Sequence, residues 1–591
     1  AVAATFAVVA IFIPVIYMKG IIGRYFLQYG ITVAAAVLLS LLEALTLTPM
    51  RCSRYLKLDS APTGVAYWAD LGFKKLAQKY EFTLGILLAH RWKTIALSFI
   101  LFLGSLYIGK HLPSEMMPPQ DQSMFMLRFK LPVGTALNVT DQKIKQVEEY
   151  LLKVPEIKGL YSVVGGFGGD AVNQGMAYAT LVDPSLRTLS QAELIKKVRK
   201  ELKHRVPGME INVQDLSLRG FTATRGFPVE FIVQGPNWEV LSQVTQKIME
   251  KMKESLRVVD VNTDVQKRMD EIQIIPDREA LARYAVNVSE VTQTINTLMG
   301  GQILNGQTEY PKDHHRYQIE IRLRAPDREK IPDLSHVMIR NTRGQRISLS
   351  KLVKVQVRPS QVLISRLNRA RAITVYGNPG PGYSQQEAME YTEKLAQSML
   401  PPGYSLKMVG SSQGFRESFQ SLMAALVLGI IVSYMILGSQ FNSFIHPITV
   451  LTALPFSLSG AFIGLAVCGQ SINMYSLIGF ILLMGIVKKN SILLVDFTHQ
   501  CRLDLKDVHQ SLLKACPIRL RPILMTSIAT IAGALPEALS IGPGSEAMIP
   551  MAISIIGGVI ASTILTLFVV PCVYSLISKL EKPDSLNSEI I

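Results

Sequence analysis

Cysteine is scarce in this sequence, and its placement excludes two kinds of site. The chain has 5 cysteines in 591 residues, and the long polar region 112–415 contains none. Those present lie in or beside apolar segments: Cys52, Cys468, Cys501, Cys516 and Cys572. Neither a disulfide framework nor a CxxC metal site is expected. A phosphate-binding loop is missing too, since no glycine-rich stretch ends in Gly-Lys-Ser or Gly-Lys-Thr.

Acidic residues are outnumbered, with 61 Lys and Arg against 45 Asp and Glu, for a net charge of +16. The basic residues are scattered, and no zinc or RNA-binding signature accompanies them, so nucleic-acid binding is not expected. Charged residues make up 18% of the chain and hydrophobic ones 49%, with a mean hydropathy of +0.26. This balance is too apolar for an ordinary soluble protein and too charged for a wholly membrane-embedded one. It predicts segments that alternate between bilayer and water.

The chain also lacks an initiator methionine and a basic leader. It begins Ala-Val-Ala-Ala inside an apolar run, which is not the pattern of a signal peptide. We expect it to be a piece of a longer protein.

Apolar runs long enough to span a membrane number eight. They cover residues 1–18, 30–50, 94–111, 420–438, 446–468, 472–496, 522–540 and 547–577. The connections 51–93 and 502–521 are rich in Lys and Arg, which places both in the cytoplasm by the positive-inside rule. The prediction is therefore a membrane hairpin 1–50, a basic cytoplasmic loop or amphipathic helix 51–93, a span 94–111, an outer region 112–415, five spans within 416–577 and a cytoplasmic tail 578–591.

Two lysines interrupt one of these runs, in the string Gly485–Phe497. The apolar residues before them, Ile472–Val487, number sixteen and would rise only about 24 Å, short of a hydrocarbon core of roughly 30 Å. The helix must therefore continue through Lys488 and Lys489. A lysine near the bilayer centre costs about 2.5–3.5 kcal/mol, which makes it a functional candidate that needs a partner. The alternative is a positive-inside flank on a short helix.

The partner of Lys489 is not evident nearby in the sequence. Asp496 lies seven residues further on, on the same helix face but about two turns away, which is too far for direct pairing. Glu43 and Glu537 are the acidic residues of the other spans. A Glu43–Lys489 contact is one interpretation, and a Glu43 carboxylate held by other helices is the alternative.

The first and last hairpins repeat each other at a fixed offset of 522 residues, which pairs Pro14 with Pro536 and Pro49 with Pro571. Parallel internal repeats are typical of transporters. By the same logic roughly 430 residues of a chain of about 1,020 would precede this sequence.

The outer region alternates strand and helix patterns. The first set is a strand at 125–131, a helix at 140–153, strands at 159–164 and 177–182, a helix behind the capping box Ser190-Gln-Ala-Glu193, and a strand at 209–216. This order, β-α-β-β-α-β, is that of a split-βαβ (ferredoxin-like) subdomain within 112–222. The same order of strands and helices recurs when 223–269 and 353–415 are taken together as a second unit. Residues 270–352, which lie between them, are therefore predicted to be a subdomain inserted into that unit. The fold class is mixed: a polytopic α-helical membrane protein with a large extracytoplasmic α+β region.

The string Gly485–Phe497 resembles the resistance-nodulation-division (RND) efflux pumps in their hydrophobe/amphiphile branch. Further matches extend the resemblance over the whole chain: Phe12-Ile-Pro14, Leu45-Thr-Leu-Thr-Pro49, Leu112-Pro-Ser114, Asp121-Gln122, Gly438–Phe444, Arg519–Ser527 and Val570-Pro571.

The resemblance implies that the eight spans are the fifth to twelfth of twelve, and that 112–415 is a second porter region with a docking subdomain. It implies a proton relay formed by Lys489, Thr526 and Arg519, with Asn490 adjacent and two aspartates in a fourth span outside this sequence. It further implies a homotrimer in the bacterial inner membrane, with a large periplasmic region, that works with a periplasmic adaptor protein and an outer-membrane channel.

The glycine-rich stretch 165–175 resembles the family's loop over the substrate path, with Phe167 between Gly166 and Gly168 as a substrate-contacting aromatic. A flexible connection that bears one Phe is the alternative.

Four methionines, Met116, Met117, Met124 and Met126, would suit a soft metal, but packing is the simpler interpretation, and no metal or cofactor is expected.

These observations predict a proton-driven efflux transporter of amphiphilic compounds, not an enzyme, and inactive alone because half of its relay lies elsewhere. The alternatives are an RND relative that exports metal ions, lipid or protein, and a membrane-anchored binding or assembly module that does not transport.

Overall fold

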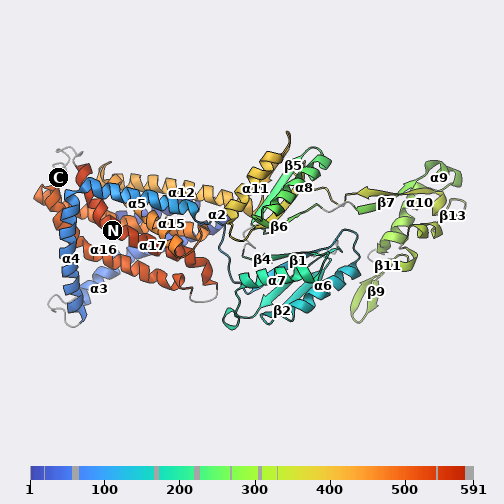
Figure 1. The fold of residues 1–591 in the computed structure, drawn as a ribbon, viewed down its shortest axis with the longest axis horizontal. Coiled ribbons are helices and arrows are strands. Elements are labelled where there is room, and N and C mark those ends of the chain that lie inside the picture. Colours follow the sequence, from blue (N-terminus) through green and yellow to red (C-terminus); the bar gives the residue numbers. More distant parts are fainter. Residues whose placement is uncertain are drawn as a thin grey trace. The chain divides into compact units, whose positions relative to one another are not determined.

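The computed structural model describes residues 2–18, 20–55, 65–165, 172–217, 226–265, 269–303, 309–328, 330–361, 363–540 and 544–578. The chain forms two compact units: Ala1–Val265 with Ser365–Ile591, and Gln266–Ile364. The larger unit holds a bundle of long helices and two α/β subdomains (Figure 1).

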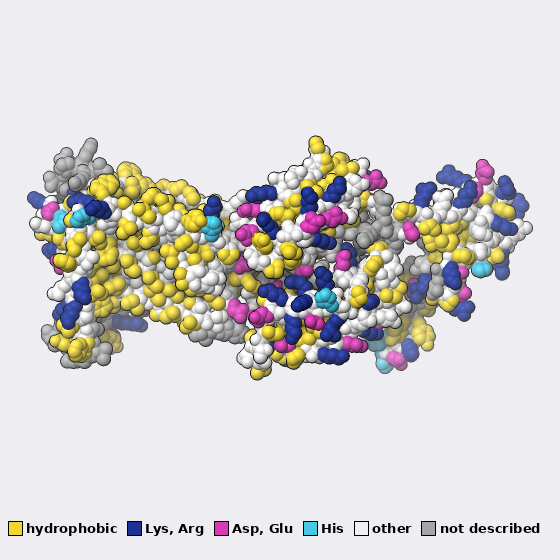
Figure 2. Space-filling model, in the orientation of Figure 1, with side chains coloured by type: hydrophobic (Ala, Val, Ile, Leu, Met, Phe, Trp, Pro, Cys, Tyr) yellow, Lys and Arg dark blue, Asp and Glu magenta, His cyan; other side chains and the backbone are white. Residues whose placement is uncertain are grey.

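The bundle makes this a multi-pass membrane protein. Among the described residues, 7 helical segments are long and apolar enough to cross a bilayer. They are α2 (Gly20–Leu45) with α3 (Leu47–Tyr55), α5 (Arg91–His111), α12 (Gly410–Phe441), α13 (His446–Leu451) with α14 (Ala453–Val467), α15 (Met474–Leu505), α16 (Val508–Ala538), and η6 (Ser545–Met548) with α17 (Ile549–Ile577). Hydrophobic side chains cover the surface of the bundle, and charged ones gather on the α/β subdomains (Figure 2).

The first predicted span, 1–18, corresponds to α1 (Val2–Ile16), whose 15 described residues rise about 22 Å. The segment is apolar but shorter than the other 7, so the eighth span stays a prediction.

The predicted basic loop 502–521 is also corrected, because its residues lie on helices. Helix α15 runs to Leu505 and α16 begins at Val508. Lys506 turns the chain with a φ of 54°, and the Asp507 carboxylate accepts hydrogen bonds from the N–H groups of His509 at 3.3 Å and Gln510 at 3.2 Å. The basic residues of 502–521 indicate where the membrane span ends, but α15 continues past that point, and α16 begins with its own cap at Asp507.

The described residues of 51–93 are also mostly helical, in α3, α4 and the start of α5. Helix α4 (Val65–Ala89) buries Tyr80, Leu84 and Leu88, spaced four residues apart on one face. The Tyr80 hydroxyl donates a 2.6 Å hydrogen bond to the carbonyl of Leu567 in α17. This amphipathic helix therefore packs against the bundle.

The two hairpins related by the offset agree in part. Pro14 lies inside α1 and Pro536 inside α16, each two residues before the end of its helix. Pro49 lies in α3, after a break at Thr46, whereas Pro571 lies in the unbroken α17. The first proline of each hairpin therefore has the same position relative to the end of its helix, whereas the helix around the second proline is broken in one hairpin and continuous in the other.

The first α/β subdomain runs in the order β-α-β-β-α-β. Its elements are β1 (Met124–Lys130), α6 (Leu137–Leu151), β2 (Ile157–Val164), β3 (Gln174–Leu181), α7 (Gln191–Arg205) and β4 (Glu210–Asp215), and the antiparallel sheet has the order β2-β3-β1-β4. Alternate residues of β1, Phe125, Leu127 and Phe129, pack in one core with residues of both helices. The predicted capping box of Ser190 and Glu193 starts α7.

The second subdomain is built from two distant parts of the chain. The first part is β5 (Val229–Gly235), α8 (Trp238–Glu254) and β6 (Val258–Thr263), and the second is β15 (Arg366–Leu367), β16 (Ala370–Pro379), α11 (Gln385–Met399) and β17 (Ser405–Met408). Strand β16 pairs with both β5 and β6, and β17 pairs with β5. The two parts therefore share one sheet across the insertion.

The smaller unit is wider than the predicted 270–352. The strands β7 (Met269–Pro276) and β14 (Val353–Ser360) pair along their whole length, so both ends of the insertion leave it as a two-stranded ribbon. Its core contains Leu281, Val291 and Leu349. Its helices are α9 (Arg278–Tyr284), α10 (Val288–Ile295) and η2 (Asn296–Gly301). Its short strands form three antiparallel pairs: β8 (Gln302–Ile303) with β11 (Glu320–Ile321), β9 (Glu309–Lys312) with β10 (His315–Gln318), and β12 (Met338–Arg340) with β13 (Arg346–Ser348).

Candidate functional site

Helix α15 carries both lysines and is the most enclosed of the long helices. Its 32 residues extend nine beyond the predicted span and rise about 48 Å, more than the hydrocarbon core requires. The Asn473 side chain caps it by accepting hydrogen bonds from the N–H groups of Tyr475 at 3.0 Å and Ser476 at 3.1 Å. Most of its side chains are buried. The lysines therefore lie in the middle of a long, packed helix and not at its end.

The two lysines face different surroundings. Lys488 is 1% exposed, and its ammonium nitrogen donates a hydrogen bond to the Ser433 hydroxyl of α12. Lys489 is exposed in this chain. Adjacent residues point about 100° apart around a helix, so only one of the two can face α12. Within the described part of the chain, neither lysine has an ion pair with a carboxylate.

The burial of Lys488 was missed in the sequence. The residues before Lys488 are largely apolar on every side of the helix, and the polar residues after it, Lys489, Asn490 and Ser491, point in different directions. No single polar face therefore indicates which lysine points inward. The one available signal was Ser433, a small polar residue in the apolar run 420–438.

Asn490 and Thr526 are brought together as one pair across α15 and α16. The Thr526 hydroxyl lies 3.3 Å from the Asn490 side-chain oxygen and 2.9 Å from the carbonyl oxygen of Ile523 in its own helix. The Thr526 hydroxyl hydrogen is therefore donated to two acceptors, one on the neighbouring helix α15 and one in the backbone of α16. Asn490 is the residue directly after Lys489, so this contact fixes the position of α15 against α16 beside the exposed lysine.

Arg519 lies elsewhere on α16. Its guanidinium carbon is 4.2 Å from the ring centroid of Phe497, and its Nε has no hydrogen bond in the described structure. Seven residues separate it from Thr526, or about 10 Å along the helix. The structure therefore places Arg519 two turns from the Asn490–Thr526 pair.

The suggested contact of Glu43 with Lys489 is not found. Glu43 pairs instead with Arg51 at 3.8 Å, and both side chains are more than half exposed. Asp496 accepts a 3.3 Å hydrogen bond from the Gln500 side chain one turn further on. Asp496 and Gln500 are i,i+4 neighbours on one helix, which commonly interact, whereas Arg51 lies eight residues after Glu43, in α3.

The predicted substrate loop, with Gly166, Phe167 and Gly168, lies outside the described residues. The strands that lead to it, β2 and β3, are described and pair up to Val164 and Gly175.

The methionines considered for a soft metal are part of the packing. Met116, Met117 and Met126 are buried, and Met124 is half-buried in β1. Within the described residues there is no cluster of three or more His, Cys, Asp or Glu side chains that would hold a metal ion.

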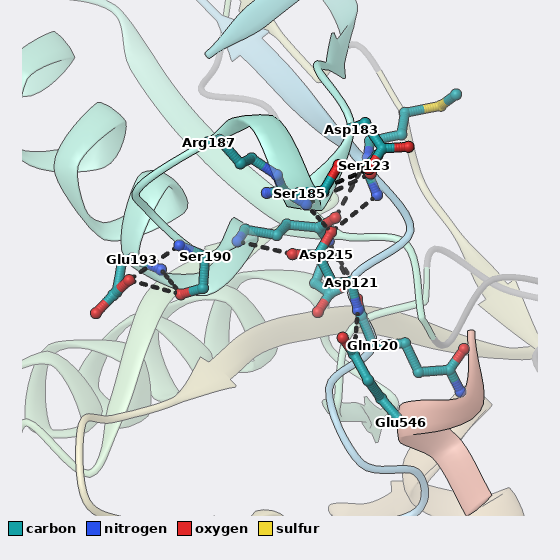
Figure 3. A network of polar contacts seen from close by, with 12 residues as sticks. Gln120, Asp121, Ser123, Asp183, Ser185, Arg187, Ser190, Glu193, Asp215 and Glu546 are labelled. Carbon is teal, nitrogen blue, oxygen red and sulfur yellow. Dashed lines mark hydrogen bonds and ion pairs between the residues drawn. The ribbon is translucent and has the colours of Figure 1, made fainter. Parts of the chain in front are cut away.

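A second polar cluster lies between the first α/β subdomain and the α16–α17 connection (Figure 3). Arg187, whose side chain is 1% exposed, forms an ion pair with Asp121. The Gln191 N–H donates to the other Asp121 oxygen at 3.1 Å. The backbone N–H of Asp121 donates a 2.8 Å hydrogen bond to the Glu546 carboxylate, which belongs to η6.

Asp215 borders this cluster and carries a pH-dependent cost. Burial raises the pKa of its carboxyl, and the nearby charge of Asp121 raises it further, against the opposing hydrogen bonds from Ser217. A carboxyl whose pKa is higher in the folded state holds its proton more tightly there. Its contribution to stability is therefore greatest at acid pH and is lost as the pH rises through the folded pKa.

We expect Asp215→Asn to raise the unfolding temperature at pH 7, because the amide keeps an oxygen for Ser217 and removes the buried charge. Each unit of raised pKa corresponds to about 1.4 kcal/mol. The gain should vanish at about pH 3, below the ordinary pKa of an aspartate, where the wild-type carboxyl is protonated in both states. Unfolding followed by intrinsic fluorescence in detergent at both pH values measures the gain. Asp183→Asn is the control, because hydrogen bonds from Ser185 lower the pKa of that exposed carboxyl. An equal gain in both variants would contradict this account.

Residues 1–578 match the family model described as the AcrB/AcrD/AcrF family. The match gives no support to the expectation that roughly 430 residues of the family precede this chain. It covers the helical bundle, both α/β subdomains and the inserted unit.

Proposed function

Because this chain belongs to the AcrB/AcrD/AcrF family of RND efflux permeases, we propose that it is a proton-driven transporter that exports amphiphilic compounds. The observation that carries the proposal is the centre of α15, where Lys488 and Lys489 interrupt an apolar membrane helix and Asn490 hydrogen-bonds to Thr526 of α16. An ammonium group inside a bilayer is costly, and where one is kept it commonly lies on a proton or ion path.

The coupling follows from the charge of Lys489. A carboxylate that faces Lys489 stabilises the ammonium, and protonation of that carboxylate removes the attraction and frees the lysine to move. The resemblance to the family assigns this part to two aspartates of a fourth span. The helix then has two arrangements with energies that differ by the binding of a proton, which is what a transporter needs to couple a gradient to opening and closing.

Thr526 supports one of these arrangements through its hydroxyl. We expect Thr526→Val to lower proton-driven efflux by up to roughly tenfold, the upper end of what one hydrogen bond contributes, because the valine cannot donate the partly buried bond to Asn490. Thr526→Ser keeps the hydroxyl and should retain most of the activity. The measurement is the rate of efflux of an amphiphilic dye such as Nile red from cells that express each variant from the native locus. Equal activity of the valine and serine variants would remove Thr526 from the relay.

The remaining parts of the proposal come from the family. We infer a homotrimer in the bacterial inner membrane, with the α/β subdomains in the periplasm and with a periplasmic adaptor and an outer-membrane channel as partners. Export of unmodified compounds requires no bond to be broken, so no enzymatic role is proposed. The substrate path would lie in the α/β subdomains, near the loop that contains Phe167.

The proposal is tested with membrane vesicles from cells that express the gene at its native locus. A proton gradient imposed across the vesicles should drive movement of Nile red, and a protonophore should stop it. Dye movement that survives the protonophore, or that needs ATP, would sink the proposed mechanism.

A further inference from the structure

The segment that leads from α5 to β1 contacts two membrane helices and both α/β subdomains. We call residues 112–123 the junction segment. It has little regular structure of its own, apart from a parallel bridge between Ser114 and Ile472. Contacts with other elements, and not secondary structure of its own, therefore hold the junction segment in its conformation.

The first set of contacts joins the junction segment to the start of the lysine helix. The Ile472 N–H donates to the carbonyl of Pro113 at 2.8 Å, and the Glu115 N–H donates to the carbonyl of Ile472 at 3.1 Å. The Ser471 hydroxyl donates to the Glu115 carboxylate at 2.5 Å. Asn473, which follows Ile472 in the chain, is the N-terminal cap of α15. Any displacement of this end of α15 is thus shared by residues 113–115.

The second set joins the junction segment to α11 in the second subdomain. The Met116 N–H donates to the side-chain oxygen of Gln385 at 2.8 Å, and the Gln386 N–H donates to the carbonyl of Ser114 at 3.1 Å. The Gln385 side-chain nitrogen donates to the carbonyl of Pro228, just before β5, at 2.7 Å. Gln385 is 4% exposed, so water cannot easily replace either bond of its amide.

The third set joins the other end of the junction segment to the first subdomain and to α17. Asp121 is held by Arg187 and by the start of α7, and its N–H donates to Glu546, three residues before α17 (Figure 3). The junction segment is therefore hydrogen-bonded at both ends to a membrane helix on one side and to an α/β subdomain on the other.

We propose that the junction segment transmits movement of α15 and α17 to the two α/β subdomains, with Gln385 and Glu546 as its positioning residues. This inference rests on the proposed proton-driven function, which supplies the movement. A contiguous chain of hydrogen bonds with no solvent gap can carry such coupling. Lys489 lies on α15, so a change in its pairing displaces the helix end to which Pro113, Glu115 and, through Met116, Gln385 are bonded.

The test compares two neighbouring glutamines. Gln385→Ala removes the buried amide. Gln386→Ala removes an exposed side chain whose bond within the described residues is to Glu390 of its own helix, at 2.9 Å. We expect Gln385→Ala to lower kcat for dye efflux by about 5- to 150-fold, the range of typical coupling energies. Its KM should change by less than about twofold, since substrate binding itself is not altered. Gln386→Ala should behave as wild type.

Two conservative variants separate coupling from simple loss of structure. Gln385→Glu keeps an oxygen for the Met116 N–H but loses the donor to Pro228, so its efflux should lie between those of wild type and Gln385→Ala. Glu546→Gln keeps an oxygen for the Asp121 N–H and should retain activity, whereas Glu546→Ala should not. If Gln385→Ala fails to fold, the Glu546 pair decides the question.

Hydrogen exchange supplies a readout that does not depend on transport. In the whole protein in nanodiscs, a shift in pH should change exchange at the start of α15, at residues 113–121 and in the first turn of α11. In Gln385→Ala the change should persist in α15 and become clearly smaller in α11, where the backbone bond from Gln386 to Ser114 remains. Identical exchange and kinetics in the Gln385→Ala and Gln386→Ala proteins would overturn the inference. Absence of proton-driven transport in the wild type would instead refute the proposed function, and the exchange pattern would still decide the role of the junction segment.

Discussion

Replacement of Lys489 by alanine is expected to reduce proton-driven efflux to the level of cells without the transporter. Lys489 is exposed in this chain, so its removal creates no cavity and leaves no buried partner unsatisfied. Expression, oligomeric state and unfolding temperature should therefore remain those of the wild type. The loss would be functional, because without the ammonium group the charge state of the carboxylates proposed to face Lys489 no longer biases the position of α15. Dye efflux at the native locus, with quantified membrane protein, measures the effect.

Lys488 is the matched control for this experiment. It lies one residue away but is buried against Ser433. Lys488→Met keeps an unbranched chain in the same space and removes the amine from an apolar setting, so we expect transport near that of wild type and an unfolding temperature that is unchanged or higher. If Lys488→Met abolishes efflux while Lys489→Ala does not, the relay has been assigned to the wrong lysine.

The second large effect is expected at the contact between α14 and α17. A Cβ atom on Gly557 would lie 2.5 Å from the carbonyl oxygen of Gly460 and 3.2 Å from the Cα of Gly464. The two backbones are therefore in direct contact, and small residues at this spacing are typical of tightly packed membrane helices. Gly557→Val must separate the helices, at a cost of about 3 kcal/mol or more.

Gly533 of α16 provides the comparison, because a Cβ added there meets nothing within 4 Å. Gly533→Val should leave the unfolding temperature nearly unchanged, whereas Gly557→Val should lower it strongly or prevent accumulation of the protein in the membrane. The measurement is thermal unfolding of the purified protein in detergent. Equal shifts in both variants would show that close packing of α14 on α17 does not limit stability.

Local elements of the fold followed from the sequence with good accuracy. The helix predicted at 140–153 is α6 (Leu137–Leu151), and the strand predicted at 209–216 is β4 (Glu210–Asp215). The predicted capping box of Ser190 with Glu193 is formed. These features depend on side chains within a few residues of one another, so the sequence contains all that decides them.

Errors arose where the neighbours of a segment decide its extent. The basic residues 502–521 were placed in a loop because charge ends a membrane span, yet nothing prevents a helix from continuing into water once it is capped at Asp507. The inserted unit was given too narrow a range because the pairing of β7 with β14 joins residues about 80 positions apart. Hydropathy detects neither effect.

The sequence by itself determined that a helix with two lysines crosses the membrane, because sixteen apolar residues are too few to span it. It did not determine which lysine is buried, what Glu43 pairs with, or where Arg519 lies. Those outcomes depend on which side chains other helices bring to α15: Ser433 of α12, Thr526 of α16, and the aromatic ring of Phe497 offered to α16. The sequence of a largely apolar helix does not indicate which helices pack against each of its faces. Only the packing of the bundle therefore decided how the site is arranged.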